Sequence, residues 1–161
     1  MAEDLAAFLE QTIARELPGL RAITDEAAGV QPEPGKWSHK EELGHLIDSA
    51  TNNHVRFVRA AVNGEFRGPG YDQNGWVSAH PYQEMPWTEL IDFWSRYNRL
   101  LAGIVRRVPE SALENQCFIA DAPPVTLRFV IRDYVLHMQH HLDHILDRAE
   151  ITRYPGAELG V

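Results

Sequence analysis

The sequence has few basic residues, a single cysteine and no long apolar run. Its 161 residues hold 15 Lys and Arg against 23 Asp and Glu, a formal net charge of −8 at pH 7. Nucleic acids and anionic membranes select a basic face, so this balance argues against both as partners. The lone Cys117 excludes an intrachain disulfide and a secreted disulfide scaffold. Without an apolar stretch of about eighteen residues or a basic leader, we expect a cytoplasmic protein.

The chain has helical periodicity in four segments. Its length is that of one ordinary domain, so we expect residues 1–161 to form a single domain. Pro18 predicts a kink or break in the first segment. Ser38 and Glu41 form a capping box at the start of the second, and Thr126 is expected to cap the fourth. Apolar residues recur at helical spacing from about Glu3 to Ala28, Ser38 to Asn63, Thr88 to Val108 and Thr126 to Glu150.

Two long connectors join these segments. Residues 64–86 contain four glycines and three prolines, and residues 109–124 form the second connector. Strand-like alternation is absent throughout, so no sheet is expected. Four helices of about 20 residues with long connectors predict an all-α four-helix bundle in which two neighbouring helices can run parallel.

Histidine is the residue type that stands out. Of eight histidines, four lie within residues 137–144. Histidines at i and i+4 lie on one helix face and can reach one divalent ion, which leaves two candidate pairs. At about 100° per residue, His137 and His141 lie in or beside the apolar arc, whereas His140 and His144 lie outside it. The inward pair is therefore His137 and His141. Histidines near a helix C-terminus can also serve only as favourable charges, but this clustering favours metal binding.

A third ligand has to come from another helix, and the second helix offers His45 and His54. The apolar stripe of this helix makes His54 look the more buried of the two. His45 aligns with Ser49, Asn52 and Arg56 in a polar strip that would face a cleft. We expect His54 to be a core or rim histidine with a satisfied hydrogen bond, but helix angle alone leaves the choice open.

Three sequence blocks carry a family resemblance. Residues 35–49 read Gly-Lys-Trp-Ser-His-Lys-Glu-Glu-Leu-Gly-His-Leu-Ile-Asp-Ser, residues 71–77 read Tyr-Asp-Gln-Asn-Gly-Trp-Val, and residues 137–145 contain His-x-x-His-His-x-x-His-Ile. Together they resemble the YfiT branch of the DinB-like superfamily, which includes metal-dependent hydrolases and bacillithiol transferases. Many DinB-like proteins have His-His-Arg-Gly-Gln where this chain has His-His-Leu-Asp-His at 140–144, which weakens the transfer of their substrates.

The resemblance implies a four-helix bundle with up-down-down-up topology, a long crossover and a metal held by three histidines. By position the ligands are His45, His137 and His141, and Arg56 matches a recurrent arginine of the family. It also implies a homodimer, for which Leu136 and Leu146, outside the main apolar arc, give a mild hint.

Three neutral imidazoles leave coordination positions open, as in catalytic metal sites. Zinc or nickel is expected, and iron also suits imidazole ligands. Such an ion lowers the pKa of bound water and deprotonates a thiol, so water would give hydrolysis and a thiol would give transfer. We expect transfer of a low-molecular-weight thiol to a small electrophilic substrate. Hydrolysis of a small molecule and a non-enzymatic metal-binding stress-response module are the alternatives. Asp48 and Arg56 are candidate catalytic residues, Asp72 could orient a ligand, and Cys117 is interpreted as structural.

Overall fold

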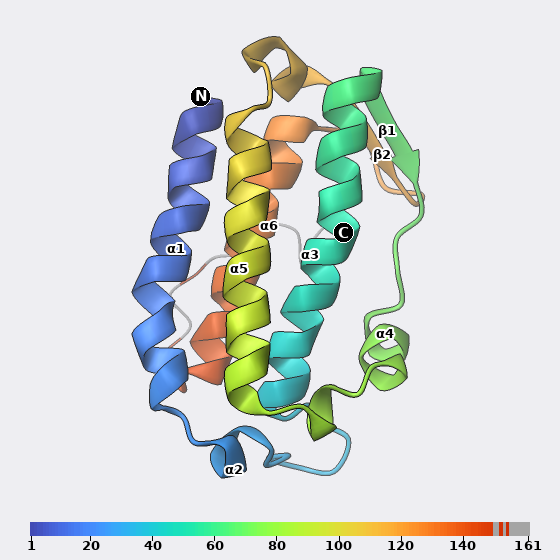
Figure 1. Ribbon diagram of the computed structural model, residues 1–161. Coiled ribbons are helices and arrows are strands. Elements are labelled where there is room, and N and C mark those ends of the chain that lie inside the picture. Colours follow the sequence, from blue (N-terminus) through green and yellow to red (C-terminus); the bar gives the residue numbers. More distant parts are fainter. Residues whose placement is uncertain (150–151, 153, 155–161) are drawn as a thin grey trace.

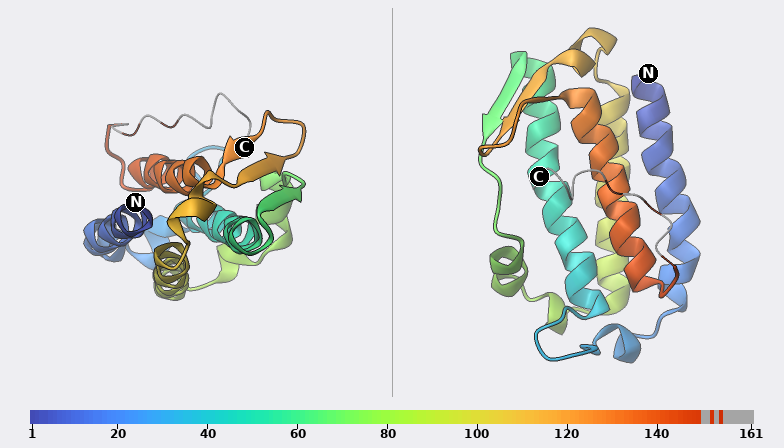
Figure 2. Two further views of the ribbon diagram at one scale, coloured as in Figure 1. Left: turned by 90° about the horizontal axis from the view of Figure 1, so that it is seen from above. Right: turned by 180° about the vertical axis from the view of Figure 1, so that it is seen from behind.

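The structure is a computed structural model that describes residues 1–149, 152 and 154. Four long helices run through this described part: α1 (Ala2–Ala22), α3 (His39–Asn63), α5 (Trp87–Arg106) and α6 (Leu127–Ile145) (Figure 1). α1 and α6 run in one direction, whereas α3 and α5 run in the other (Figures 1 and 2). α1 and α3 each pack against both α5 and α6. This is the predicted four-helix bundle with up-down-down-up topology.

The crossover that joins the parallel helices α3 and α5 travels the length of the bundle (Figure 1). It contains strand β1 (Glu65–Gly68), helix α4 (Gln73–Ala79) and the 3-10 helix η1 (Tyr82–Glu84). The connector before α6 contains the 3-10 helix η2 (Glu110–Glu114) and strands β2 (Gln116–Ile119) and β3 (Val125–Thr126). β1 pairs in parallel with β2, and β2 pairs antiparallel with β3.

The expectation of no strands was therefore wrong. Each strand spans only two to four residues, which is too short to display alternation. Phe66 and Cys117 are paired in register although they come from the two different connectors. Cys117 is fully buried in this small sheet.

The helix starts follow the predicted capping residues. The Ser38 hydroxyl accepts from the backbone N–H of Glu41 at 3.2 Å, and the Glu41 carboxylate accepts from the backbone N–H of Ser38 at 2.8 Å. Thr126 Oγ1 accepts from the backbone N–H of Phe129 at 3.2 Å. Both predicted caps are confirmed. The predicted end of the last helix at Glu150 lies outside the described residues, and α6 ends at Ile145.

The first helix continues through Pro18 and ends at Ala22, so the prediction of a break at Pro18 was wrong. The break comes at Thr24, whose hydroxyl accepts from the backbone N–H of Ala27 and caps the short helix α2 (Asp25–Ala28). Pro18 lies in the last turns of α1, where the fully buried Leu20 holds the helix in the bundle. Leu146 was expected to face outward, but it is partly buried against the core and lies against Gly19.

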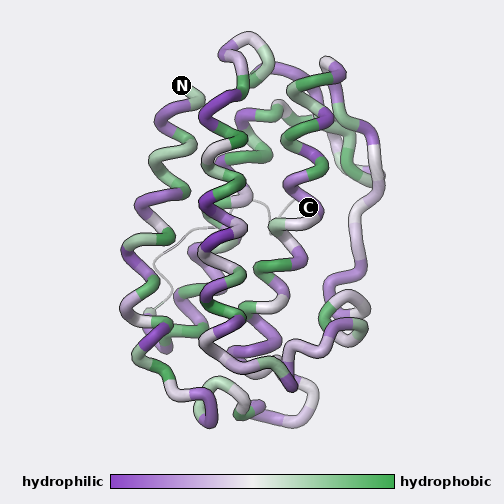
Figure 3. The backbone as a smooth tube through the Cα atoms, viewed as in Figure 1, coloured by the Kyte–Doolittle hydropathy of each residue, from purple (hydrophilic) through white to green (hydrophobic). Residues whose placement is uncertain are grey.

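Hydrophobic and hydrophilic positions alternate along each long helix (Figure 3). The buried apolar side chains of these helices form one core cluster. Trp87, Trp94 and Phe57 are the largest of the fully buried side chains. His54 lies at the rim with its Nδ1 3.0 Å from the Tyr97 hydroxyl, as expected for a hydrogen-bonded rim histidine. Among the described residues, no helix is both long and apolar enough to cross a membrane.

Candidate metal centre

Three histidines from α3 and α6 meet between the two helices. His45 Nε2 lies 3.1 Å from His137 Nε2, although the residues are 92 positions apart in the chain. The His141 ring lies 4.6 Å from that of His45 and 4.7 Å from that of His137, centroid to centroid. One ring nitrogen from each histidine lies within 4.8 Å of the other two. The structure thus brings together the three residues that the sequence predicted as ligands.

Burial keeps the rings of His45 and His137 neutral. His45 is fully buried, and loss of hydration together with the nearby His141 lowers the pKa of His45 to about 3. Burial likewise holds the pKa of His137 well below its usual range. A neutral imidazole has one nitrogen with a free lone pair, which is the form that binds a metal.

The spacing of the histidines fits a divalent metal ion. Two imidazole nitrogens about 2.0–2.1 Å from one zinc ion are about 3.3 Å apart at the tetrahedral angle, close to the 3.1 Å seen here. His45 Nδ1 is buried and has no hydrogen-bond partner among the described residues. The Trp37 ring lies 5.0 Å from the His45 ring and covers it. The donor set is therefore suited to zinc, nickel or iron.

Glu42 supports this group, and sequence reasoning missed it. His141 Nδ1 lies 2.9 Å from Glu42 Oε1, and His144 Nδ1 lies 3.2 Å from the same oxygen. When His141 donates to this carboxylate through Nδ1, its Nε2 remains available to a metal. The available signal was position, because Glu42 lies three residues before His45 and so shares its helix face. His144, which had no assigned chemistry, is a second contact of Glu42.

A cavity extends from His137 along the interface of α3 and α6. The predicted polar strip contributes Ser49 and Arg56 to its lining, whereas Asn52 donates to the backbone carbonyl of Asp48. Arg56 is only 5% exposed. The cavity is lined by Ser49, Asn53, Arg56, Tyr71, Gln73, Ile119, Val125, Phe129, Val130, Asp133, Tyr134, His137 and Tyr154.

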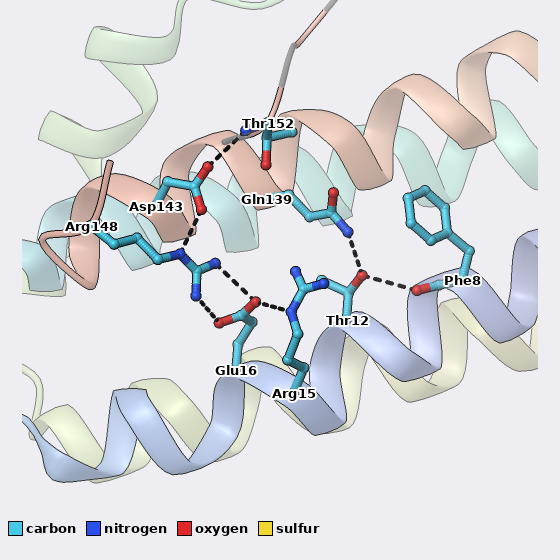
Figure 4. Close-up of polar contacts among 8 residues, drawn as sticks. All are labelled: Phe8, Thr12, Arg15, Glu16, Gln139, Asp143, Arg148 and Thr152. Carbon is cyan, nitrogen blue, oxygen red and sulfur yellow. Dashed lines mark hydrogen bonds and ion pairs between the residues drawn. The ribbon is translucent and has the colours of Figure 1, made fainter. Parts of the chain in front are cut away.

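Three described residues after α6, Arg148, Thr152 and Tyr154, contact α1, α6 and this cavity. Arg148 forms ion pairs with Asp143 at 2.7 Å and with Glu16 at 2.9 Å, and Asp143 also accepts from the backbone N–H of Thr152 (Figure 4). The Tyr154 ring then lies 5.1 Å from the His137 ring. These contacts place an aromatic side chain beside the histidine group.

Two other predicted residues lie elsewhere. Asp48 is buried and accepts from the Tyr82 hydroxyl at 2.6 Å, on the side of α3 that faces the crossover, and burial raises its pKa. It does not line the cavity described above, and its catalytic role stays a prediction. Asp72 is the N-cap residue of α4. Burial raises the pKa of Cys117 to about 11, which fits its interpretation as a structural residue.

Comparisons with known proteins place this arrangement among relatives. The family model of the DinB superfamily matches residues 9–145. A Bacillus pumilus protein named as a candidate metal-dependent hydrolase is 27% identical, over 90% of this chain and 85% of its own length. The solved structure of YfiT from Bacillus subtilis superimposes with a TM-score of 0.80 at 19% identity, covering 91% of this chain and 84% of that one. The mycothiol-dependent maleylpyruvate isomerase superimposes with a TM-score of 0.68 at 12% identity, covering 94% of this chain and 62% of that one.

Proposed function

The chain belongs to the DinB superfamily, and from this premise we propose that it is a metal-dependent enzyme acting on a small molecule. His45, His137 and His141 would hold the divalent ion, with zinc or nickel as the first expectation. The observation that carries the proposal is the meeting of three imidazoles, two of them buried and neutral, one of which, His137, lines a cavity. The names of the curated relatives support a metal-dependent reaction.

When bound, the ion would supply Lewis-acid chemistry that lowers the pKa of a thiol or of water at its open positions. Our lead reaction is transfer of a low-molecular-weight thiol to an electrophilic carbon of the substrate. The sulfur–carbon bond forms, the leaving group departs with its bonding electrons, and the thiol proton passes to solvent. The fold shared with a mycothiol-dependent enzyme supports this choice.

The protein's own residues would orient the ligands and limit access of water. The Glu42 carboxylate fixes the tautomer and the ring orientation of His141. The Trp37 ring packs beside the His45 ring and the Tyr154 ring beside the His137 ring, which would reduce competing contact with water. Asp48 and Arg56 remain our candidates for residues that assist catalysis.

Hydrolysis is the second candidate reaction, because the curated relatives are named as hydrolases. Water would then be the nucleophile in place of the thiol. The two reactions differ in their dependence on thiol. A panel of thiols with a chlorinated aromatic electrophile would give turnover only for transfer, and turnover without thiol would indicate hydrolysis.

The metal site is tested with full-length protein purified without a histidine tag. We expect about one divalent ion per chain by elemental analysis, and a thermal midpoint that rises when zinc or nickel is added to chelator-treated protein. His45→Ala should abolish both results. His54→Ala, a matched histidine on the same helix that contacts Tyr97 instead, should retain both. A wild-type protein that neither contains a metal nor is stabilised by one would refute the site, and catalysis that survives His141→Ala would refute the mechanism.

A further inference from the structure

Arg56 lies within the bundle as a charged side chain with almost no protein partner. Its hydrogen bond in the structure is a long one, 3.5 Å from Nη1 to the Asn53 side-chain oxygen. Among the described residues, no carboxylate lies within the 4.0 Å ion-pair distance of its guanidinium. Asp133 lines the same cavity from α6, beyond that distance, and its Oδ2 accepts from the Tyr154 hydroxyl at 3.4 Å. Arg56 therefore has guanidinium N–H groups available for a ligand at the cavity wall.

Such an arrangement costs stability unless a ligand compensates for it. Moving a cation out of water costs several kcal/mol in real proteins when no partner replaces the lost hydration. Burial lowers the pKa of Arg56 somewhat, but an arginine remains charged in proteins. The guanidinium presents five N–H donors in a planar fork that matches the two oxygens of a carboxylate. A bound organic anion would supply the missing partner.

The other walls of the cavity indicate what would be attached to that anion. Most of them are aliphatic or aromatic, contributed by the small sheet, by the first turns of α6 and by Tyr154. His137 lines the same cavity as Arg56, and this cavity of about 20 Å³ has to widen before a molecule larger than water can contact both residues. A ligand with an apolar body and one carboxylate satisfies both kinds of surface.

We propose that Arg56 is the anchor for a carboxylate group on a small, largely apolar substrate, whose body extends along the cavity toward the three histidines. The part of this proposal in which the substrate body points toward the histidines rests on the proposed function. Binding of the carboxylate to Arg56 does not depend on the metal, so the two ideas can fail separately.

The test compares benzoate with its neutral isostere benzamide, using chelator-treated full-length protein. We expect benzoate to raise the thermal midpoint in a concentration-dependent manner and benzamide to leave it unchanged. In Arg56→Met the affinity for benzoate should fall about tenfold to a hundredfold, the range for a lost hydrogen-bonded charge pair. Arg56→Lys should bind benzoate with an affinity between those of the wild type and Arg56→Met. It should still prefer benzoate to benzamide, because lysine keeps the positive charge but lacks the planar pair of donors. Arg59→Met, an exposed arginine on the same helix, should bind benzoate like the wild type.

The stability of the variants without ligand gives an independent readout. Because removal of an unpaired buried cation relieves its desolvation cost, Arg56→Met should unfold at the same temperature as the wild type or higher. Equal effects of benzoate and benzamide, or unchanged benzoate affinity in Arg56→Met, would overturn the proposal. Loss of the folded state in Arg56→Met would also overturn it, by showing that the guanidinium holds the bundle together. Benzoate binding by a protein that takes up no metal would refute the proposed function and leave the carboxylate site standing.

Discussion

The Glu16 carboxylate offers a sharp test of how Arg148, which follows α6, is held against the bundle. Its side chain is 1% exposed on α1, and it accepts from two arginines at once (Figure 4). Arg148 donates from Nη1 to Oε2 and from Nη2 to Oε1, both at 2.9 Å, and Arg15 donates to Oε1 as well. Glu16→Gln changes the charge and one acceptor atom and leaves the shape nearly the same.

The magnitude follows from these contacts. A glutamine amide keeps one acceptor oxygen and turns an NH2 group toward a guanidinium, so one of the two Arg148 bonds is lost. A hydrogen bond to a charged group is worth about 1.5–3 kcal/mol, and the partly exposed Arg148 can recover some hydration. We therefore expect Glu16→Gln to lower the free energy of unfolding by about 2 kcal/mol at pH 7.

The dependence on pH provides the second arm of this test. Burial would raise the pKa of Glu16, but the hydrogen bonds and charges of Arg148 and Arg15 outweigh it and lower the pKa below the usual 4.5. An acid with a lowered folded-state pKa stabilises the fold above its unfolded pKa, and this contribution is lost as the pH falls through the folded value. The difference between wild type and Glu16→Gln should therefore narrow in acid.

Urea unfolding at pH 7 and at about pH 3 measures both effects. Glu10→Gln is the matched control, because Glu10 lies on the same helix and pairs with Arg106 at the surface. The control should remain close to wild type at both pH values. Equal losses in the two variants, or a loss for Glu16→Gln that does not change with pH, would refute the reasoning.

Three further predictions concern the surroundings of the histidine group. Glu42→Gln should weaken metal binding about tenfold to a hundredfold, measured by competition with a chelator, because His141 loses a charged partner, and unchanged affinity would contradict this role. Gly44→Ala should lower the free energy of unfolding by about 1–3 kcal/mol, because the added Cβ would overlap the Tyr82 ring, and a neutral result in denaturant melts would count against that contact. Because burial raises the pKa of Asp48, the folded state loses stability as this group ionises, so Asp48→Asn should match or exceed wild-type stability at pH 7. Any advantage should disappear in acid, where Asp48 is protonated, and a clear loss at pH 7 would contradict this. Retained turnover in the same variant would exclude catalysis by Asp48.

Local patterns in the sequence predicted the features that depend on local contacts. The capping box at Ser38 is contained within four residues, and the inward pair His137 and His141 follows from the angle between successive residues of one helix. The polar strip on α3 likewise indicated a cavity, because Ser49 and Arg56 lie on the same helix face as His45.

Features that depend on contacts between distant segments could not be read in the same way. β1 exists because residues 65–68 pair with residues 116–119, and neither segment alternates over a length that would show it. The role of Glu42 depends on how closely α3 approaches α6, which no single-helix pattern contains. Pro18 was expected to kink or break its helix, but the helix is unbroken there because packing of the turn after it outweighs the lost backbone hydrogen bond.

Which helices pack against one another also bears on how the chain folds. Among the four described long helices, the antiparallel contacts join α1 to α5 and α3 to α6, and neither pair is consecutive in the chain. No early helical hairpin is therefore available as a nucleus, and the loops that must close span residues 23–86 and 64–126. Because folding rates fall as contacts become less local, we expect this bundle to fold in milliseconds or slower, not in the microseconds typical of bundles built from successive hairpins.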